Sequence, residues 1–242
     1  SAGDIARYRR DDAVIALTEW EANWYRDRAV PSVYVTGLGP NLLALPPMTR
    51  EPATILFVGR KERYKGYHAL RDAAPLVWAE RPDARFIAIG QPAWNARFSP
   101  APRDPRWEDL GVVSEDAKAT AFARSTIFAM PSEHETFGLT YLEAWTAGLP
   151  VVAGDISPLR EVVREGVDGL HARNEPHAVA EAILALLRDP ERATLMGQNG
   201  RRRVMTEFTW AAVAKKTEAA YRDAVTLRSR EKHVRRLAKR AR

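Results

Sequence analysis

Apolar and polar positions alternate in two different rhythms along the middle of the chain. Short apolar runs, four of them closed by glycine or proline, predict buried strands at residues 53–59, 85–90, 126–131, 150–154 and 169–173. Between these runs the apolar residues recur at helical spacing, for example in 68–80 and in 115–124, where Ser114 has the position of an N-cap. Strands that alternate with helices are typical of βαβ units. The pattern therefore predicts an α/β fold, a Rossmann-like parallel sheet with helices on both faces.

Two segments interrupt this alternation. Residues 91–109 are rich in proline and show no periodicity, so we interpret them as a loop. Residues 176–225 have helical spacing that is punctuated by Asp189-Pro190 and by Gly197–Gly200. We expect helices there, with a break at each of these punctuation points.

The N-terminal part has a separate pattern. Residues 13–18 and 32–36 read as strands with a helical segment between them. A single unit of this kind cannot cover its own apolar faces. We therefore interpret residues 1–36 as the remnant of a preceding domain with its linker, followed by a main domain over 37–221 and a tail over 222–242.

Composition limits the classes of protein that the sequence fits. The chain has 242 residues, of which 45% are hydrophobic and 28% charged, as in an ordinary soluble globular protein. No apolar run is long enough to span a bilayer, and the first residues contain no apolar core of a signal peptide. The absence of cysteine excludes disulfides, thiol nucleophiles and thiolate metal sites. We expect a cytoplasmic protein.

Positive charge is concentrated in the tail. The formal net charge is +6, and residues 222–242 hold nine lysines or arginines against two acidic residues. A basic terminal helix suits an anionic membrane surface, nucleic acid or an acidic partner, whereas the simplest interpretation is a solvated helix end. The tail has no aromatic residue after Tyr221, which argues against a nucleic-acid partner. The functional interpretation that we keep for it is peripheral contact with a membrane.

Candidate chemistry is concentrated after the third of the five predicted strands. Residues 131–148 read P-S-E-H-E-T-F-G-L-T-Y-L-E-A-W-T-A-G, with Glu135 before the predicted helix and Glu143 within it. The unpaired amides at the start of a helix and the positive end of its dipole form an anion site, and Gly138 allows close approach of a phosphate. The two carboxylates could accept hydrogen bonds from hydroxyl groups. The alternative is that Glu135 only complements the helix dipole and Glu143 faces solvent.

Basic residues follow the first of these strands. Residues 58–66 read V-G-R-K-E-R-Y-K-G, with Arg60 and Lys65 in the loop. Arginine offers a bidentate fork to phosphate, and lysine offers a mobile point charge. Taken alone they are ordinary surface charges. Because ligands bind at the carboxyl ends of parallel strands, we expect them at the same edge of the sheet as the glutamates.

Four sequence segments, taken together, resemble a known family. In chain order they read I-L-F-V-G-R-x-x-x-x-K-G, P-S-E-H-E-T-F-G-L-T-Y-L-E-A-W-T-A-G-L-P-V-V-A, P-L-R-E-V-V-R-E-G-V-D-G-L and F-T-W-A-A-V-A-K-K-T-E-A-A-Y. Over residues 53–221 their order and spacing resemble the C-terminal, donor-binding half of a retaining GT-B glycosyltransferase of family 4, group 1 type. Glu135 and Glu143 match the signature pair of that family.

The resemblance implies a role for each matched residue. Arg60 and Lys65 would bind the diphosphate of a nucleotide-sugar donor and stabilise it as it leaves, and Glu135 would contact the donor sugar. These three residues are the expected catalytic set. The expected donor-binding residues also include Glu143 on the ribose, the amides of Phe137, Gly138 and Leu139 on the distal phosphate, and a turn at Leu110, Gly111 and Val112 under the nucleobase. Glu161 matches a commonly acidic position without an assigned role.

The same resemblance implies the reaction and what it requires. It would be hexosyl transfer with retention at the anomeric carbon, with a nucleotide diphosphate sugar as donor substrate and no cofactor. The sequence has no Asp-x-Asp, the motif that usually binds a metal-bound diphosphate in another glycosyltransferase fold. Two cationic side chains in the place of a metal agree with that absence. We expect metal independence.

Two departures from the family pattern leave alternatives open. After Ile89 the chain reads G-Q-P-A-W-N in place of the usual glycine-rich turn, and little is present of the acceptor-binding N-terminal half beyond the crossing at Gly37–Gly39. We expect the acceptor, which could be a glycan, a lipid or a small molecule, to bind mainly to that missing half. The missing half could be deleted or could be a separate chain. We expect the isolated chain to be inactive. The alternative function is a catalytically degenerate nucleotide-sugar-binding or scaffold module.

Overall fold

The computed structural model describes residues 2–92 and 101–240, with side chains for 5–92 and 101–230. The chain divides into two compact units. One unit comprises residues 1–39 together with 208–242, and the other comprises residues 40–207. The expected loop at 91–109 includes residues 93–100, which lie outside the described part.

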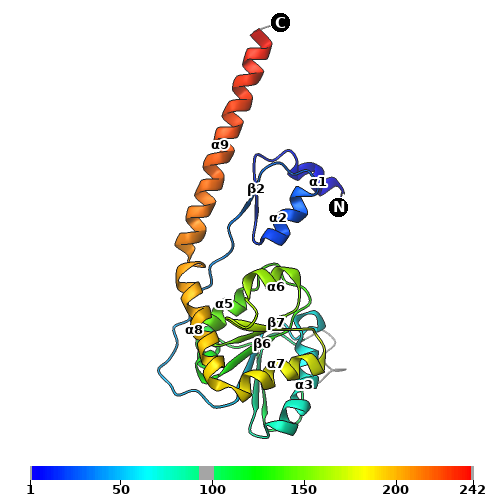
Figure 1. The fold of residues 1–242 in the computed structure, drawn as a ribbon, viewed down its shortest axis with the longest axis vertical. Coiled ribbons are helices and arrows are strands. Elements are labelled where there is room, and N and C mark those ends of the chain that lie inside the picture. Colours follow the sequence, from blue (N-terminus) through cyan, green and yellow to red (C-terminus); the bar gives the residue numbers. More distant parts are fainter. Residues whose placement is uncertain (1, 93–100, 241–242) are drawn as a thin grey trace. The chain divides into compact units, whose positions relative to one another are not determined.

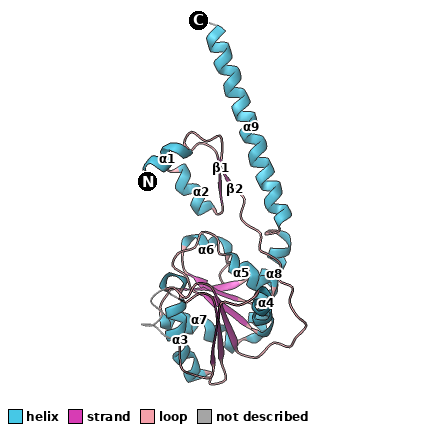
Figure 2. Ribbon diagram, turned by 180° about the vertical axis from the view of Figure 1, so that it is seen from behind, coloured by secondary structure: helices cyan, strands magenta, loops and turns pink. Residues whose placement is uncertain are grey.

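The larger unit is built on a parallel sheet of six strands (Figures 1 and 2). The strands are β3 (Thr54–Val58), β4 (Arg85–Ile89), β5 (Trp107–Gly111), β6 (Ile127–Met130), β7 (Val151–Gly154) and β8 (Gly169–Ala172). The helical elements are η1 (Arg63–Lys65), α3 (Tyr67–Glu80), α4 (Glu115–Arg124), α5 (Leu139–Thr146), α6 (Ser157–Val162), α7 (Pro176–Arg188) and α8 (Pro190–Thr206). Helix α3 packs against α7 and α5 packs against α8, with the sheet between the two pairs (Figure 2). The predicted Rossmann-like fold is confirmed.

The order of the strands creates one point at which the winding direction reverses. The order across the sheet is β5-β4-β3-β6-β7-β8. From β3 the chain builds outward to β4 and β5, then returns to place β6 on the other side of β3, where Ile55 pairs with Ile127. The loops after β3 and β6 therefore leave neighbouring strands in opposite directions. In open α/β sheets, ligands bind in the crevice at such a point.

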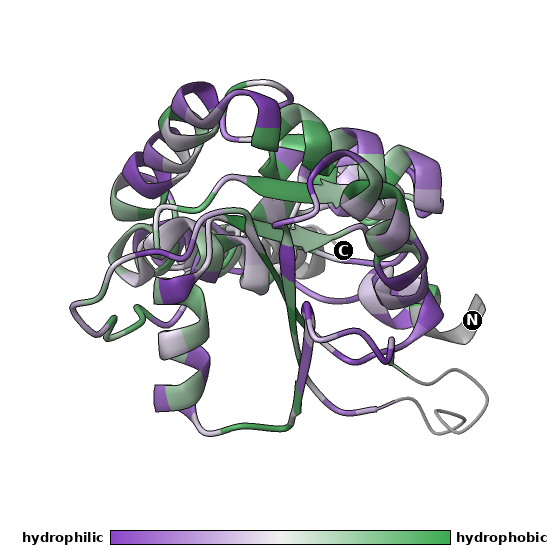
Figure 3. Cartoon of the chain, turned by 90° about the horizontal axis from the view of Figure 1, so that it is seen from below, coloured by the Kyte–Doolittle hydropathy of each residue, from purple (hydrophilic) through white to green (hydrophobic). Residues whose placement is uncertain are grey.

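Apolar strands explain why the sheet is buried on both sides. In β3, the side chains of Ile55, Leu56 and Phe57 have no exposed surface, although they alternate between the two faces of the sheet. Continuous apolar runs of this kind are what a parallel sheet covered on both faces requires. Figure 3 shows the strands as strongly hydrophobic, and the helices around them as mixed.

The prediction of a loop through residue 109 is wrong for its last residues, because Trp107–Gly111 form β5. This strand lies at the edge of the sheet and pairs only with β4. Trp107 is buried and its ring stacks on Phe86, with 5.4 Å between ring centroids. The next two residues, Glu108 and Asp109, are charged and not buried. An edge strand with a single buried side chain leaves little hydropathy signal.

The break that we expected at Gly197–Gly200 is also absent, since α8 passes through both glycines. Their small size serves packing against α5 and the turn that follows it. A Cβ atom on Gly197 would lie 2.1 Å from the carbonyl oxygen of Gly148, and one on Gly200 would lie 2.1 Å from the ring of Trp145. The chain does break at Asp189-Pro190, where Asp189 caps α8 by accepting from the amide of Arg192.

The smaller unit contains the predicted pair of N-terminal strands. Strands β1 (Val14–Ala16) and β2 (Val33–Val35) are parallel and are connected by α2 (Glu19–Arg26), which Thr18 caps. Helix α1 (Ala2–Tyr8) was not expected from the sequence. Helix α9 (Trp210–Arg240) carries the basic tail. Among the helices of the described part, none is both long and apolar enough to cross a membrane.

Candidate functional site

The loops after β3 and β6 meet through an ion pair. The ammonium group of Lys65, at the end of η1, contacts the Oε1 atom of Glu135 in the loop that leads to α5. Both side chains are largely buried, with exposed fractions of 19% and 12%. Two residues that the sequence predicted for one site are therefore in direct contact at the point where the sheet reverses its winding.

Backbone contacts fix these two loops against each other. The amide of Glu133 donates to the carbonyl of Tyr64 at 2.7 Å. Gly66 has a φ of 77°, and a Cβ atom there would lie 2.5 Å from the carbonyl oxygen of Pro131. Asn174, in the turn after β8, donates to the carbonyl of Arg63 at 2.9 Å. The position of Lys65 is thus determined by the main chain around it.

Tyr64 brings the second predicted cation to the same place. The guanidinium of Arg60 donates to the hydroxyl of Tyr64 and lies 5.3 Å from the centroid of its ring. The Nζ atom of Lys65 lies 5.5 Å from the same centroid, and the ring of His134 lies 6.2 Å away. No pattern in the sequence indicated a role for Tyr64. Its contribution is to hold Arg60 and Lys65 on one aromatic ring.

Helix α5 begins beside this cluster. Gly138 caps the helix in the left-handed region with a φ of 82°, and a Cβ atom there would lie 2.5 Å from the ring of Tyr141. Both facts require glycine. The amides of Gly138 and Leu139 donate to no residue of the described part, as is usual in the first turn of a helix. They remain available to an anion.

Tyr141 anchors the strand that delivers the loop. Its hydroxyl donates to the carbonyl of Met130, the last residue of β6, and lies 3.2 Å from the Oγ atom of Ser132. Burial raises the pKa of the Tyr141 hydroxyl, so it remains a donor. The start of α5 is therefore tied to the end of β6.

Glu143 is turned inward, contrary to the alternative that it faces solvent. Its side chain is 14% exposed and accepts from Nζ of Lys118, in α4, at 3.3 Å. Burial raises the pKa of Glu143, and the opposing charge of Lys118 offsets only part of that effect. Lys118 also pairs with Glu115 at 2.8 Å. In the described structure no direct contact joins Glu143 to the pair of Lys65 and Glu135.

The predicted base-binding residues lie at the end of β5. Gly111 has a φ of 64°, and the space where a Cβ atom would stand is open to 4 Å. Its amide donates to Oδ1 of Asp109 at 3.1 Å, and its carbonyl accepts from Gly90 at 2.7 Å. Leu110 is half-buried and Val112 is 76% exposed. The end of β5 therefore has open space on the side of the absent Cβ atom of Gly111.

A buried lysine that the sequence did not single out supports this turn. Lys61 is only 5% exposed, and its ammonium pairs with the carboxylate of Asp109. The hydroxyl of Tyr67 lies 3.4 Å from the other carboxylate oxygen. Asp109 therefore connects the loop after β3 to the amide of Gly111. A lysine four residues from another lysine has no pattern that would reveal this pairing.

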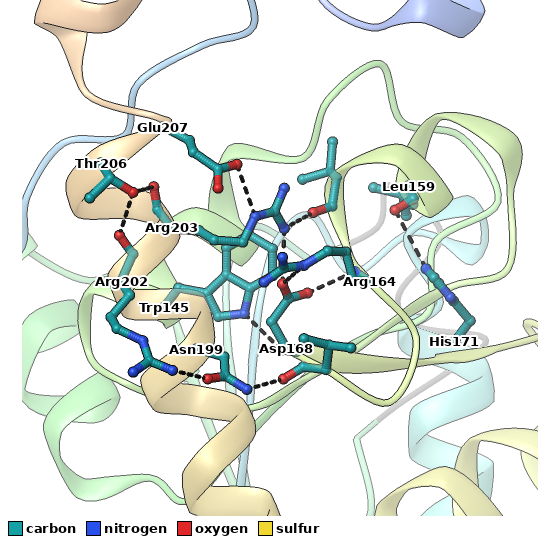
Figure 4. A network of polar contacts seen from close by, with 12 residues as sticks. Trp145, Leu159, Arg164, Asp168, His171, Asn199, Arg202, Arg203, Thr206 and Glu207 are labelled. Carbon is teal, nitrogen blue, oxygen red and sulfur yellow. Dashed lines mark hydrogen bonds and ion pairs between the residues drawn. The ribbon is translucent and has the colours of Figure 1, made fainter.

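A buried ionic network positions the other end of α5 (Figure 4). The carboxylate of Asp168, which has no exposed surface, accepts from Nη1 of Arg203 at 2.9 Å and from Nε of Arg164 at 2.7 Å. Arg203 also donates to the carbonyl of Val162, and the indole of Trp145 donates to the carbonyl of Asp168 at 3.0 Å. The network connects α5 and α8 to the turn before β8. Arg164 and Asp168 belong to the third sequence segment, whose role could not be read from its residues.

This edge of the sheet has the chemistry of an anion site with hydrogen-bond acceptors beside it. Arg60, Lys65 and the amides at the start of α5 offer positive charge, while Glu135 and Glu143 offer carboxylates to hydroxyl groups. Among the described residues, no group of three or more His, Asp or Glu side chains could hold a metal ion. The arrangement fits a ligand that is both anionic and rich in hydroxyls.

Comparison with known sequences agrees with this chemistry. A sequence model of the family described as glycosyl transferases, group 1, matches residues 47–203. A D-inositol 3-phosphate glycosyltransferase of Corynebacterium glutamicum is 32% identical over 183 residues, which cover 71% of this chain and 43% of the relative. The chain spans between 40% and 60% of the length of such relatives.

Solved structures show the same fold. Sucrose-phosphate synthase from Thermosynechococcus elongatus superposes with a TM-score of 0.77 at 24% identity, over 93% of this chain and 61% of that one. HepE of Anabaena, solved in complex with UDP and glucose, superposes with a TM-score of 0.74 at 18% identity, over 87% of this chain and 62% of that one.

Proposed function

Because the chain belongs to the group 1 glycosyl transferases and has the fold of the C-terminal GT-B domain, we propose that residues 40–207 bind the nucleotide diphosphate sugar donor of a retaining hexosyltransferase. The observation that carries this proposal is the contact between Lys65 and Glu135. In this proposal Lys65 is the cation for the phosphate and Glu135 the carboxylate for the sugar hydroxyls, and the two lie next to each other at the reversal point of the sheet.

The diphosphate occupies the cationic part of the site. Arg60 and Lys65, which share the ring of Tyr64, bind its oxygens, and the amides of Phe137, Gly138 and Leu139 at the start of α5 bind the distal phosphate. As the bond from the anomeric carbon to the phosphate oxygen breaks, negative charge grows on the leaving diphosphate. Fixed cations stabilise that charge in the transition state more than in the bound donor, and this difference accelerates the reaction.

The nucleoside occupies the part of the edge beside β5. Glu143 accepts hydrogen bonds from the ribose hydroxyls, and the main chain at Leu110, Gly111 and Val112 contacts the base. Support comes from the inward position of Glu143 and from the open main chain at Gly111. The bound UDP in the related structure of HepE makes UDP the first nucleotide to test here.

The acceptor half of the enzyme lies outside this donor-binding unit. We assign residues 1–36 to the acceptor-side domain and its linker, 37–221 to the donor domain, whose compact binding unit is residues 40–207, and 222–242 to a basic tail that contacts an anionic membrane surface from the cytoplasmic side. The acceptor, a glycan, lipid or small molecule, binds mainly to acceptor-side segments beyond these 242 residues, and the isolated chain has no transferase activity. The complete enzyme needs neither cofactor nor metal.

Thermal stability in the presence of UDP-, GDP- and ADP-sugars tests the proposal, because a ligand that binds only the folded state raises the melting temperature. One of these donors should raise it, and the matching nucleoside at the same concentration should raise it less. If no donor shifts the melting temperature, or if the nucleoside shifts it equally, the donor site is wrongly assigned. In the full-length enzyme, an inverted anomeric centre in the product would refute retention.

A further inference from the structure

A cavity of about 590 Å³ lies at the opposite edge of the sheet from the donor site. It is lined by residues just before β3, β6 and β7, by the ends of α5 and α7, and by α8. Its volume falls within the range of roughly 300–1,000 Å³ that small-molecule sites occupy. Strand β3 is five residues long, so about 15 Å of strand separates this cavity from the loops of Lys65 and Glu135.

The wall of the cavity is largely apolar. Its apolar side chains include those of Pro52, Ile127, Pro150, Leu186, Leu187 and Ala193. A purely apolar cavity would bind neutral molecules without discrimination. Charged groups at its margin therefore decide what it can select.

Three arginines line the same cavity, and only one of them is neutralised. Arg81 pairs with Asp83 at 2.8 Å. Arg50 donates to the backbone carbonyls of Ser125 and Ala147 and to no carboxylate of the described part. Arg201, in α8, forms no hydrogen bond and no ion pair through its side chain with residues 5–92 or 101–230.

The two uncompensated arginines are close enough to affect each other. Both residues are exposed to solvent, but partial burial of its guanidinium lowers the pKa of Arg50, and the like charge of Arg201 lowers it further. The contacts of Arg50 with Ser125 and Ala147 have a structural role, since they satisfy the backbone carbonyls of the residues that cap the C-terminal ends of α4 and α5. Arg201 has no such role, and an anion between the two guanidinium groups would relieve their repulsion.

We propose that this cavity binds a small amphipathic anion, a carboxylate or a phosphate monoester attached to an apolar body, with Arg50 and Arg201 on its charged head. Guanidinium forks match both oxyanions in geometry. The apolar wall takes the body of the ligand. Helix α5 begins at the donor site and ends at this cavity, so the two sites share one element but no residue.

Calorimetric titration of the chain with octanoate, octyl phosphate and octan-1-ol tests this proposal. At least one of the two anions should bind saturably, and at least about tenfold more tightly than the alcohol, because charge-assisted hydrogen bonds are lost with the head group. UDP, GDP or ADP should not displace the anion. If neither anion binds at millimolar concentration, if the alcohol binds as tightly, or if a nucleotide displaces the anion, the proposal is refuted.

Two neighbouring arginines provide a matched pair of variants. Arg201→Met should weaken binding of the anion about tenfold or more, whereas Arg201→Lys should retain most of it. Arg202→Met removes the same charge from the next position of α8, where Arg202 contacts Asn199 outside the cavity, and should leave binding unchanged. If Arg201→Met and Arg202→Met lose the same affinity for the anion, the effect is due to general surface charge and the proposed site is refuted.

Discussion

Lys65 and Glu135 lie seventy positions apart in the sequence and form an ion pair with each other. Neither residue has another charged partner in the described structure. A phosphate that binds to Lys65 must share or displace this contact, and a sugar that binds to Glu135 does so beside the same ammonium group. The pair therefore couples recognition of the diphosphate to recognition of the sugar.

Lys65→Ala tests the contribution of this lysine to recognition of the diphosphate. The variant should bind the nucleoside diphosphate about 10- to 100-fold more weakly, the equivalent of one lost charge-assisted hydrogen bond of about 1.5–3 kcal/mol. Affinity for the nucleoside should not change. Calorimetry with both ligands measures the difference, and Lys216→Ala, an exposed position in the smaller unit, controls for the change in net charge. An unchanged affinity for the diphosphate would remove Lys65 from the site.

Glu135→Ala tests the sugar contact. The variant should lose more affinity for the nucleotide sugar than for the nucleoside diphosphate, because only the sugar offers hydroxyl groups to this carboxylate. The exposed neighbour Glu133, changed to alanine, should affect neither ligand through its side chain. Equal losses for both ligands in Glu135→Ala would contradict the role assigned to Glu135.

Glu143→Gln should stabilise the free protein while it weakens nucleotide binding. Burial raises the pKa of Glu143, so folding favours its protonated form, and this stabilisation is lost as the pH rises through the raised pKa. Glutamine resembles the protonated form, and a tenfold change in proton affinity on folding corresponds to about 1.4 kcal/mol. The variant should therefore have a higher free energy of unfolding than the wild type at neutral pH, and the difference should vanish in acid. Urea titrations at a series of pH values measure it, and a stability gain that does not depend on pH would contradict the explanation.

Asp168→Asn tests how far α5 depends on the network in Figure 4. Removal of one partner from a buried ion pair typically costs about 3–5 kcal/mol, and Arg203 loses its most buried carboxylate. The free energy of unfolding should therefore fall by about 3 kcal/mol. Asp189→Asn, at the cap of α8, should be close to neutral because asparagine caps a helix equally well. If the two variants are equally stable, the network has no special role.

Chelation tests the absence of a metal requirement. Treatment of the full-length enzyme with EDTA should leave its transferase rate unchanged, because Arg60 and Lys65 supply the positive charge that the leaving diphosphate needs. A rate that falls with EDTA and recovers on addition of Mg²⁺ or Mn²⁺ would contradict this prediction.

The sequence predicted those features that depend on regular patterns. Buried strands such as β3 and β6 are continuous apolar runs, and the switch of period between strand and helix is clear enough to give the Rossmann-like fold. The placement of Lys65 and Glu135 at one edge of the sheet was expected from one rule, that ligands bind at the carboxyl ends of parallel strands, whereas their direct contact was not predicted.

The features that the sequence did not predict depend on contacts between distant segments. The pairing of Glu143 with Lys118, and of Lys61 with Asp109, joins residues whose individual positions show no periodicity. The edge strand β5 has a single buried side chain, so its hydropathy resembles that of a loop. Gly197 and Gly200 look like helix breakers, yet they allow α8 to approach α5.

We propose that a nucleotide diphosphate binds where the loops after β3 and β6 meet. Amide NMR spectra of the isotopically labelled chain, recorded during titration with the nucleoside diphosphate that stabilises it most, test this claim directly. The amides of Gly138, Leu139 and Gly111 should shift most, and Lys65→Ala should suppress these shifts. Shifts confined to other segments, or equal shifts in the wild type and in Lys65→Ala, would contradict the claim.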